Sequence, residues 1–166
     1  WQGGTADWSD PNNWRPNNVP TIDNCVVIPA NTVISGTNYN AYGKNLKVKN
    51  TGNLNIQSSN NLTIADGIIV EPTGTFQIEN TSKLVQINDV VSDGNIIYKR
   101  TAPSIKGSDY VYWSSPVFNQ ALGSIYTTPT QGPKYEWDPT VNNGNGVGIN
   151  ISHGNWVSPT ATMATG

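Results

Sequence analysis

The sequence contains few of the residues on which catalysis and ionic binding depend. It has one cysteine and one histidine, and charged residues make up 12% of the chain, with a formal net charge of -2. A single cysteine excludes an internal disulfide, and a chain without a basic excess has no field that could hold a nucleic-acid backbone. No apolar run approaches the roughly 20 residues that cross a bilayer. We therefore expect neither a nucleic-acid partner nor insertion into a membrane.

The residue types that carry most enzyme chemistry occur here without recognisable partners. Cys25 lies in "NCVVIP" between apolar residues, which predicts a buried and inert thiol rather than a nucleophile. His153 is expected in a surface loop, and Ser114-Ser115-Pro116 lacks the flanking glycines of a nucleophile elbow. The carboxylates give no pair whose separation the sequence defines. The sequence therefore predicts no enzyme within these residues.

Turn-forming chemistry is what the chain has in excess. It holds 23 asparagines, 16 glycines and 11 prolines. Asparagine side chains bond to nearby backbone and tolerate positive φ, while glycine reaches those angles freely. Strong helix formers such as alanine, glutamate and leucine are scarce. An all-β fold is therefore expected.

Short β-prone pieces recur between Val26 and Lys99. Each places apolar residues at positions i and i+2, on one face of a strand, with a mostly polar residue between them. Six of the pieces start six to eight residues apart: Leu46–Val48, Leu54–Ile56, Leu62–Ile64, Ile68–Val70, Phe76–Ile78 and Leu84–Ile87. Such regularity is an internal repeat.

Two folds satisfy this repeat. Antiparallel hairpins would form a sandwich, whereas turns that all run the same way would wind a parallel β-helix whose rung takes three strands, about 22 residues. The linking segments lack the Asn-Gly or Asp-Gly pairs of two-residue hairpins, except at Asp66-Gly67 and Asp93-Gly94. The pattern favours a short right-handed parallel β-helix, with the sandwich as the alternative.

Changes in composition and in the repeat divide the chain into three parts. Residues 1–20 form a Trp-rich N-terminal cap, and residues 21–100 form the short-repeat β-helix. After Arg100 the repeat stops and aromatic residues become frequent, which indicates the start of a second β-rich unit over residues 101–166, antiparallel and sandwich-like. No closing strand is visible at the end of the chain, so this unit is expected to be incomplete and the chain to be part of a longer protein.

Aromatic residues are the candidate ligand-binding groups. Exposed rings stack on the apolar faces of sugars. The candidates are Trp8, Trp14, Tyr110, Tyr112, Trp137 and Trp156. For Trp1, Trp8 and Trp14 the favoured interpretation is that the indoles cover the open end of the β-helix, with glycan binding as the alternative. In "DYVYWSSPV" strand alternation places Tyr110 and Tyr112 on one face and Trp113 on the other, toward the core of the second unit.

Calcium is the one cofactor that the residue types suggest. Asp7 and Asp10, together with Asn12 and Asn13, offer oxygen ligands near the N-terminus, and Asp138 opens an amide-rich loop. None of them follows a recognised calcium-loop spacing, so solvated loops are the simpler interpretation.

A sequence of motifs resembles a known class of proteins. In order they are "GGTADWSDPNNWRPNNVPTIDNCVVIPA", "NLTIADG", "VEPTGTF", "LVQINDVVSDGNIIYKR" and "YVYWSSPV". Together they are similar to the large surface and secreted proteins of gliding Bacteroidota that leave the cell by type IX secretion. In that class a Trp-rich opening precedes a small β-helix, and a "YWSSPV" segment opens the next β-unit. Its members include adhesin-like proteins and multi-domain enzymes, and a C-terminal sorting domain is usual.

The resemblance and the repeat together give the functional expectation. We expect a non-catalytic extracellular module of a large surface protein, acting in adhesion or as a structural spacer at the cell surface. Its partners would be surface glycans or other proteins of the same surface layer. Two alternatives stay open: a carbohydrate-binding module attached to a secreted polysaccharide-degrading enzyme, and a self-associating subunit of an extracellular filament.

Overall fold

The computed structural model describes residues 1–2, 4–102, 104, 106, 111–115, 119–124, 135–137, 156–157 and 162–163. The chain divides into two compact units, Trp1–Ser104 and Ile105–Gly166, and each is described by itself. The sequence places this boundary after Arg100.

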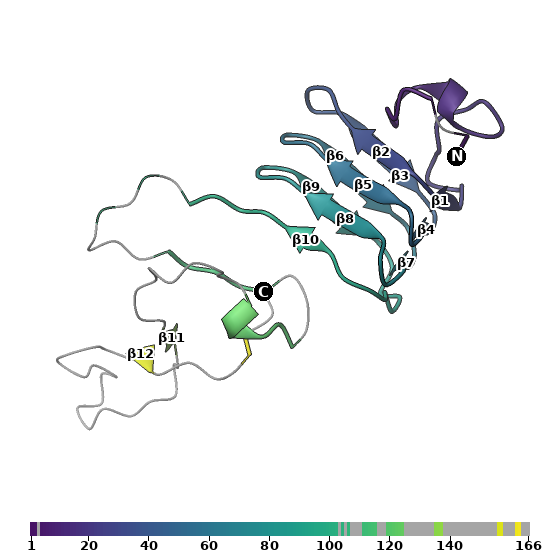
Figure 1. Ribbon diagram of the computed structural model, residues 1–166. Coiled ribbons are helices and arrows are strands. Elements are labelled where there is room, and N and C mark those ends of the chain that lie inside the picture. Colours follow the sequence, from purple (N-terminus) through teal and green to yellow (C-terminus); the bar gives the residue numbers. More distant parts are fainter. Residues whose placement is uncertain are drawn as a thin grey trace. The chain divides into compact units, whose positions relative to one another are not determined.

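The first unit is a β-solenoid with three walls (Figure 1). Its three turns each contribute one short strand to each wall, and a fourth turn begins with one further strand. The strands of the first turn are β1 (Val26–Ile28), β2 (Asn31–Ile34) and β3 (Asn40–Gly43). The second turn has β4 (Leu46–Val48), β5 (Asn53–Ile56) and β6 (Asn61–Ile64). The third has β7 (Ile68–Val70), β8 (Thr75–Ile78) and β9 (Lys83–Gln86), and β10 (Ile97–Tyr98) begins the fourth.

All strand pairs of this unit are parallel, which confirms the solenoid and excludes the hairpin alternative for these residues. The walls are β1-β4-β7, β2-β5-β8-β10 and β3-β6-β9. Val26 pairs with Leu46, Asn31 with Asn53 and Asn40 with Asn61. These offsets of 20 to 22 residues match the rung length that the repeat predicts.

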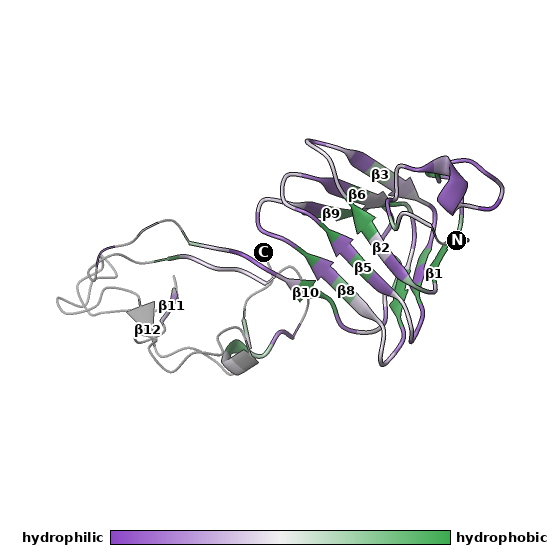
Figure 2. Ribbon diagram, turned by 45° about the horizontal axis from the view of Figure 1, so that its top comes forward, coloured by the Kyte–Doolittle hydropathy of each residue, from purple (hydrophilic) through white to green (hydrophobic). Residues whose placement is uncertain are grey.

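The alternation of side chains along each strand builds the core. Every second residue points inward and stacks on its equivalent in the next turn, so that Ile34, Ile56 and Ile78 form one column and Leu54 lies over Phe76. Figure 2 shows the alternation as bands of apolar and polar residues along the strands. Burying each such Leu, Ile or Phe contributes roughly 1.5–3 kcal/mol relative to leaving it exposed. Burial of the columns therefore helps to hold successive turns together.

Strand β3 is a strand that the repeat pattern did not predict. Its inward residues are Ala41 and Gly43, which are poor strand formers. Space explains the choice, since a Cβ atom on Gly43 would lie 2.9 Å from Val26 Cγ2 and 3.0 Å from Ile64 Cδ1. The corner between the walls is thus too narrow for a larger residue.

Polar groups in the turns are satisfied from one rung to the next. Asn60 is fully buried, and its side chain accepts a hydrogen bond from Tyr39 N and donates to the carbonyls of Gly36, Gln57 and Ser58. One turn later the buried Ser82 donates to the Gln57 carbonyl at 2.6 Å. The excess of asparagine is therefore explained in part by bonds that tie turns together.

The N-terminal segment adds a partial turn at one end of the solenoid. Trp8 N donates to the Val33 carbonyl, and Val33 N donates to the Ala6 carbonyl. A parallel bridge between Asp7 and Val33 accompanies these bonds. Trp8 consequently points inward on the same side as Ile34, and this segment closes that end of the core.

Within the described residues, the other end of the first unit is covered only in part. The guanidinium of Arg100 lies 3.7 Å from the centre of the Tyr98 ring and donates to the carbonyls of Glu79 and Ser82. These bonds replace, for the last turn, the contacts that a further rung would make. These contacts of Arg100 lie beside β8 and the turn after it. Within the described residues, no further strand covers the outer edge of β9.

The described parts of the second unit are a short helix and one strand pair. Helix η2 spans Leu122–Ser124, and β11 (Glu136–Trp137) pairs antiparallel with β12 (Trp156–Val157). An isolated antiparallel bridge joins Ala121 to Thr162. The strand predicted at "DYVYWSSPV" is wrong for residues 111–114, which form no regular strand, although Ser115 makes a bridge and is buried.

Candidate functional site

Two predicted ligand-binding residues lie inside the protein. Trp8 has 0% and Trp14 has 4% of its surface exposed, and both belong to the hydrophobic core. Neither indole offers a face to a sugar, so the binding interpretation of these two residues is wrong. The physical reason is that the open end of a solenoid core must be covered by apolar surface, and the tryptophans supply it.

The tryptophans pack as edge-to-face pairs. The ring centres of Trp1 and Trp14 lie 4.8 Å apart, as do those of Trp8 and Trp14, with interplanar angles of 78° and 66°. Such pairs are worth about 0.5–1.5 kcal/mol beyond the area they bury. Trp14 Nε1 donates to the Trp8 carbonyl at 2.8 Å, whereas the indole N–H of Trp8 has no acceptor among the described residues.

The candidate calcium ligands near the N-terminus are used by their own loop. Asp7 Oδ1 accepts from the backbone N–H and hydroxyl of Ser9, and Asp10 accepts from Asn12 and Thr5. The backbone N–H of Asn12 holds the pKa of Asp10 below its usual value, so this carboxylate stays charged as the N-cap of helix η1 (Pro11–Asn13). In the described ranges no three carboxylate, histidine or cysteine side chains gather around one point. Asp138 lies outside the described residues.

The remaining aromatic candidates belong to the second unit. Tyr112 is 74% exposed, and Trp113, expected in a core, is 38% exposed. Trp137 and Trp156 are paired across β11 and β12. Tyr110 lies outside the described residues. Among the predicted ligand-binding residues whose side chains the structure describes, Tyr112 is thus the one with a largely exposed ring.

A shallow groove lies on the outer surface of the wall β3-β6-β9, and the sequence did not point to it. Its volume is about 430 Å³, and its lining residues are Pro20, Thr21, Ile22, Tyr42, Thr63 and Ile87. Tyr42 and Thr63 are register partners on β3 and β6, both pointing outward. We call this feature the Tyr42 groove. The signal that could have found it is the alternation of "NAYG", which directs Tyr42 away from the core.

Polar side chains run parallel to the Tyr42 groove. Asn40 and Asn61 occupy the outward position two residues earlier on β3 and β6, and Lys83 follows in register on β9. Asn61 Nδ2 donates to Asn40 Oδ1 at 2.8 Å. The wall therefore combines an aromatic ring, a hydroxyl, two amides and an ammonium group on one outer face.

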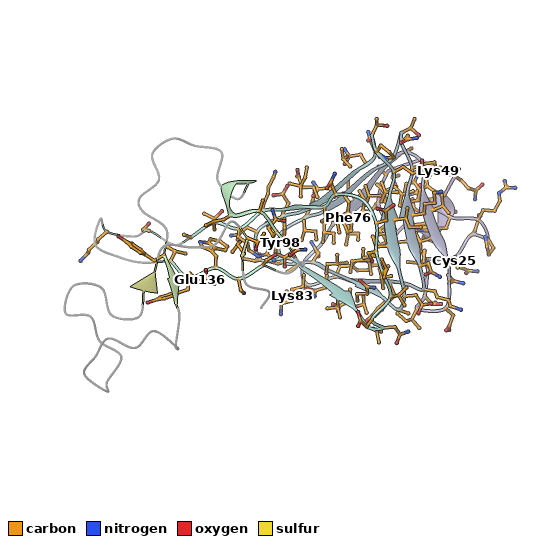
Figure 3. All side chains as sticks on the ribbon, turned by 90° about the horizontal axis from the view of Figure 1, so that it is seen from below. Cys25, Lys49, Phe76, Lys83, Tyr98 and Glu136 are labelled. Carbon is orange, nitrogen blue, oxygen red and sulfur yellow. The ribbon has the colours of Figure 1, made fainter. Side chains whose placement is uncertain are left out.

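The prediction of a buried thiol is wrong. Cys25 is exposed, and its sulfur accepts from Asn45 Nδ2 at 3.6 Å. Val26 and Ile28 point inward on β1, so the alternation sends Cys25 and Val27 outward. Figure 3 shows Cys25 outside the walls and Phe76 between them. His153 lies outside the described residues.

An ion pair links two successive turns on the outer face of the wall β1-β4-β7. Lys47 Nζ lies 2.8 Å from Glu71 Oε1, and the backbone N–H of Asn50 donates to Glu71 Oε2 at 2.9 Å. Lys47 and Asn50 together lower the pKa of Glu71. The pair joins the second turn to the third and is used structurally.

Comparison with known proteins places the chain in one family. In the described residues no helix is long and apolar enough to cross a membrane. No curated protein and no solved structure matches the chain. The model of one family, described as "Domain of unknown function (DUF8693)", matches residues 1–166, so the chain belongs to that family.

Proposed function

We propose that this protein is a non-catalytic extracellular module of a large bacterial surface protein, of the class exported by type IX secretion, and that it acts as a rigid spacer that also supports adhesion. The observation that carries the proposal is the continuous pairing of all three walls through three turns. A parallel solenoid of this kind is a quasi-one-dimensional rod in which each turn rests on its neighbours.

Contacts between turns support the role of a stiff element. Besides the strand pairs, the outer turns are linked by side chains: Thr51 Oγ1 donates to the Pro29 carbonyl, and Thr73 Oγ1 donates to the Asn50 carbonyl. Equivalent positions in successive turns thus make equivalent bonds. Bending or stretching the rod would break several of them at once, which is the property that a spacer requires.

Two measurements test this proposal. Amides of β4, β5 and β6 should exchange with solvent slowly and together, because they open only when the whole solenoid unfolds. Purified chain in excess should also reduce attachment of cells that carry the parent protein. Hydrolysis or elimination by the chain on a panel of polysaccharides would overturn the non-catalytic assignment.

A second candidate function is carbohydrate binding, favoured by the Tyr42 groove. Tyr42 offers a ring face for stacking, Thr63 a hydroxyl, and Asn40 and Asn61 amides for sugar hydroxyls. On a glycan array the chain should then retain neutral saccharides. Tyr42→Ala should weaken that binding about two- to tenfold, since a stacked ring is worth about 0.5–1.5 kcal/mol. Tyr112→Ala, which removes an exposed ring of the second unit, is the control, and equal losses in both variants would count against the groove.

The finer description of the fold is part of the same proposal. We infer a right-handed solenoid, because crossovers between parallel strands take that hand. Residues 101–166 would form an antiparallel sandwich-like unit, to which the pair β11 and β12 contributes. An electron-density map of the parent protein tests both statements, and a single-sheet second unit would overturn the latter.

A further inference from the structure

Strand β9 leaves one edge of its wall without a partner strand in the part of the chain that the structure describes. It is the last strand of β3-β6-β9, and its other edge pairs with β6. The N–H groups of Lys83 and Ile87 donate to the carbonyls of Asn60 and Ile64, on the β6 side. A parallel strand directs alternate residues to opposite neighbours. The N–H and C=O groups of Leu84 and Gln86 therefore point to the open edge.

Exposed apolar side chains gather at this same end of the solenoid. They come from the last strands and the segment between them: Val85, Ile87, Val90, Val91, Ile97 and Tyr98. Figure 3 shows Lys83 and Tyr98 at this end. The opposite end is closed by the buried indoles of Trp8 and Trp14. A free strand edge beside apolar surface is a template for strand addition, whereas a closed end is not.

We infer that the open edge binds the same edge of a second copy, with the two β9 strands antiparallel and a two-fold axis at Val85. In this register Leu84 of one copy lies opposite Gln86 of the other, and the two residues exchange both backbone hydrogen bonds. The two-fold axis generates the same pair of hydrogen bonds between Gln86 of the first copy and Leu84 of the second. The outward N–H and C=O groups of each β9 strand are then all paired with those of the other. Because the other end of each solenoid is closed, the assembly stops at two copies.

Charge favours this register over a parallel one. A parallel, in-register neighbour would place Lys83 beside the same lysine of the second copy, and like charges directly opposite are destabilising. The antiparallel register places Lys83 opposite Ile87. The ammonium group then meets an apolar residue instead of a second ammonium group.

The first test is the mass of the full chain in solution. Sedimentation equilibrium should show 17.9 kDa at low concentration and a plateau at twice that mass as the concentration rises. Val85→Asp places two carboxylates on the axis and should weaken association about tenfold or more. Val27→Asp is the matched control, because Val27 also points outward and is 37% exposed against 45% for Val85. Far-ultraviolet circular dichroism and thermal melting show that both variants fold.

The second test reports the register directly. In a Cys25→Ser background, Val85→Cys should form a disulfide-linked dimer under mild oxidation, because residues on the axis form a non-hydrogen-bonded pair with close Cα atoms. Val27→Cys in the same background should stay monomeric. A wild type that is monomeric at all concentrations, growth beyond two copies, equal behaviour of the two aspartate variants, or equal cross-linking of the two cysteines would each overturn the inference.

Discussion

Replacing Asn60 with alanine tests how the solenoid turns are held together. The Asn60 side chain is fully buried. Its Oδ1 accepts from Tyr39 N at 3.0 Å, and its Nδ2 donates to the carbonyls of Gly36, Gln57 and Ser58 at 3.1 to 3.2 Å. Asn60 therefore links the turn between β2 and β3 in the first rung to the turn between β5 and β6, in which it lies.

The expected loss follows from counting these bonds. The Nδ2 group has two hydrogens for three carbonyls, and Oδ1 makes one further bond, so at most three full hydrogen bonds are removed. The Gln57 carbonyl keeps its bonds from Asn60 N and Ser82 Oγ, whereas the Tyr39 N–H loses its acceptor. At about 1 kcal/mol per net bond, Asn60→Ala should lower the free energy of unfolding by about 3 kcal/mol.

Urea unfolding of the full chain measures this change. Asn61→Ala is the matched control, because the neighbouring side chain makes a single outer bond, to Asn40 Oδ1. The free energy of unfolding of that control should stay within about 0.5 kcal/mol of the wild-type value. Equal losses of unfolding free energy in the two variants, or a loss below about 0.5 kcal/mol for Asn60→Ala, would refute this role of Asn60.

Three further predictions concern packing and charge. Gly52→Ala should cost about 2–3 kcal/mol, because the new Cβ atom would overlap the Ile28 carbonyl oxygen, whereas Gly67→Ala meets only ordinary contacts and is the control; urea midpoints decide between them. Trp8→Ala should cost about 4 kcal/mol in the same assay, and Trp8→Phe much less, because it removes an indole N–H that has no acceptor in the described part of the chain. The pKa of Glu71 is lowered from its ordinary value of 4.5 in the folded protein, so its contribution to stability is present above that pH and is lost as the pH falls through the lower folded pKa. Between pH 5 and pH 3, Glu71→Gln should accordingly show a shallower loss of unfolding free energy than the wild type, and equal slopes would contradict the role of the Lys47 contact.

The sequence was most informative where one rule acts at every position. Alternation of apolar residues, with turns at near-constant spacing, predicted both the strands and the rung length, because each inward residue must stack on its equivalent one turn away. The same rule read carefully would have placed Cys25 outside, since it precedes the inward Val26. Strand β3 was not predicted because the space at a corner selects glycine at position 43, which no local pattern records.

The candidate sites depended on burial and on contacts between residues far apart in the sequence. From the sequence alone, Trp8 and Trp14 served equally well as a cap or as a binding platform, and only burial separated the two. The Tyr42 groove joins a loop, two neighbouring strands and Ile87, which meet because the chain returns to the same wall once per turn.

The sequence by itself determined that the chain is all-β, that it repeats, and that apolar residues must face a common interior. Those properties are local, since they depend on the period of the side chains and on the turn residues between strands. Only the tertiary structure decided which end of the solenoid Trp8 and Trp14 close, and that β9 has an edge without a partner strand among the described residues. An end or an edge is defined by the neighbour that is absent, and residues far apart along the chain determine which neighbours a strand has.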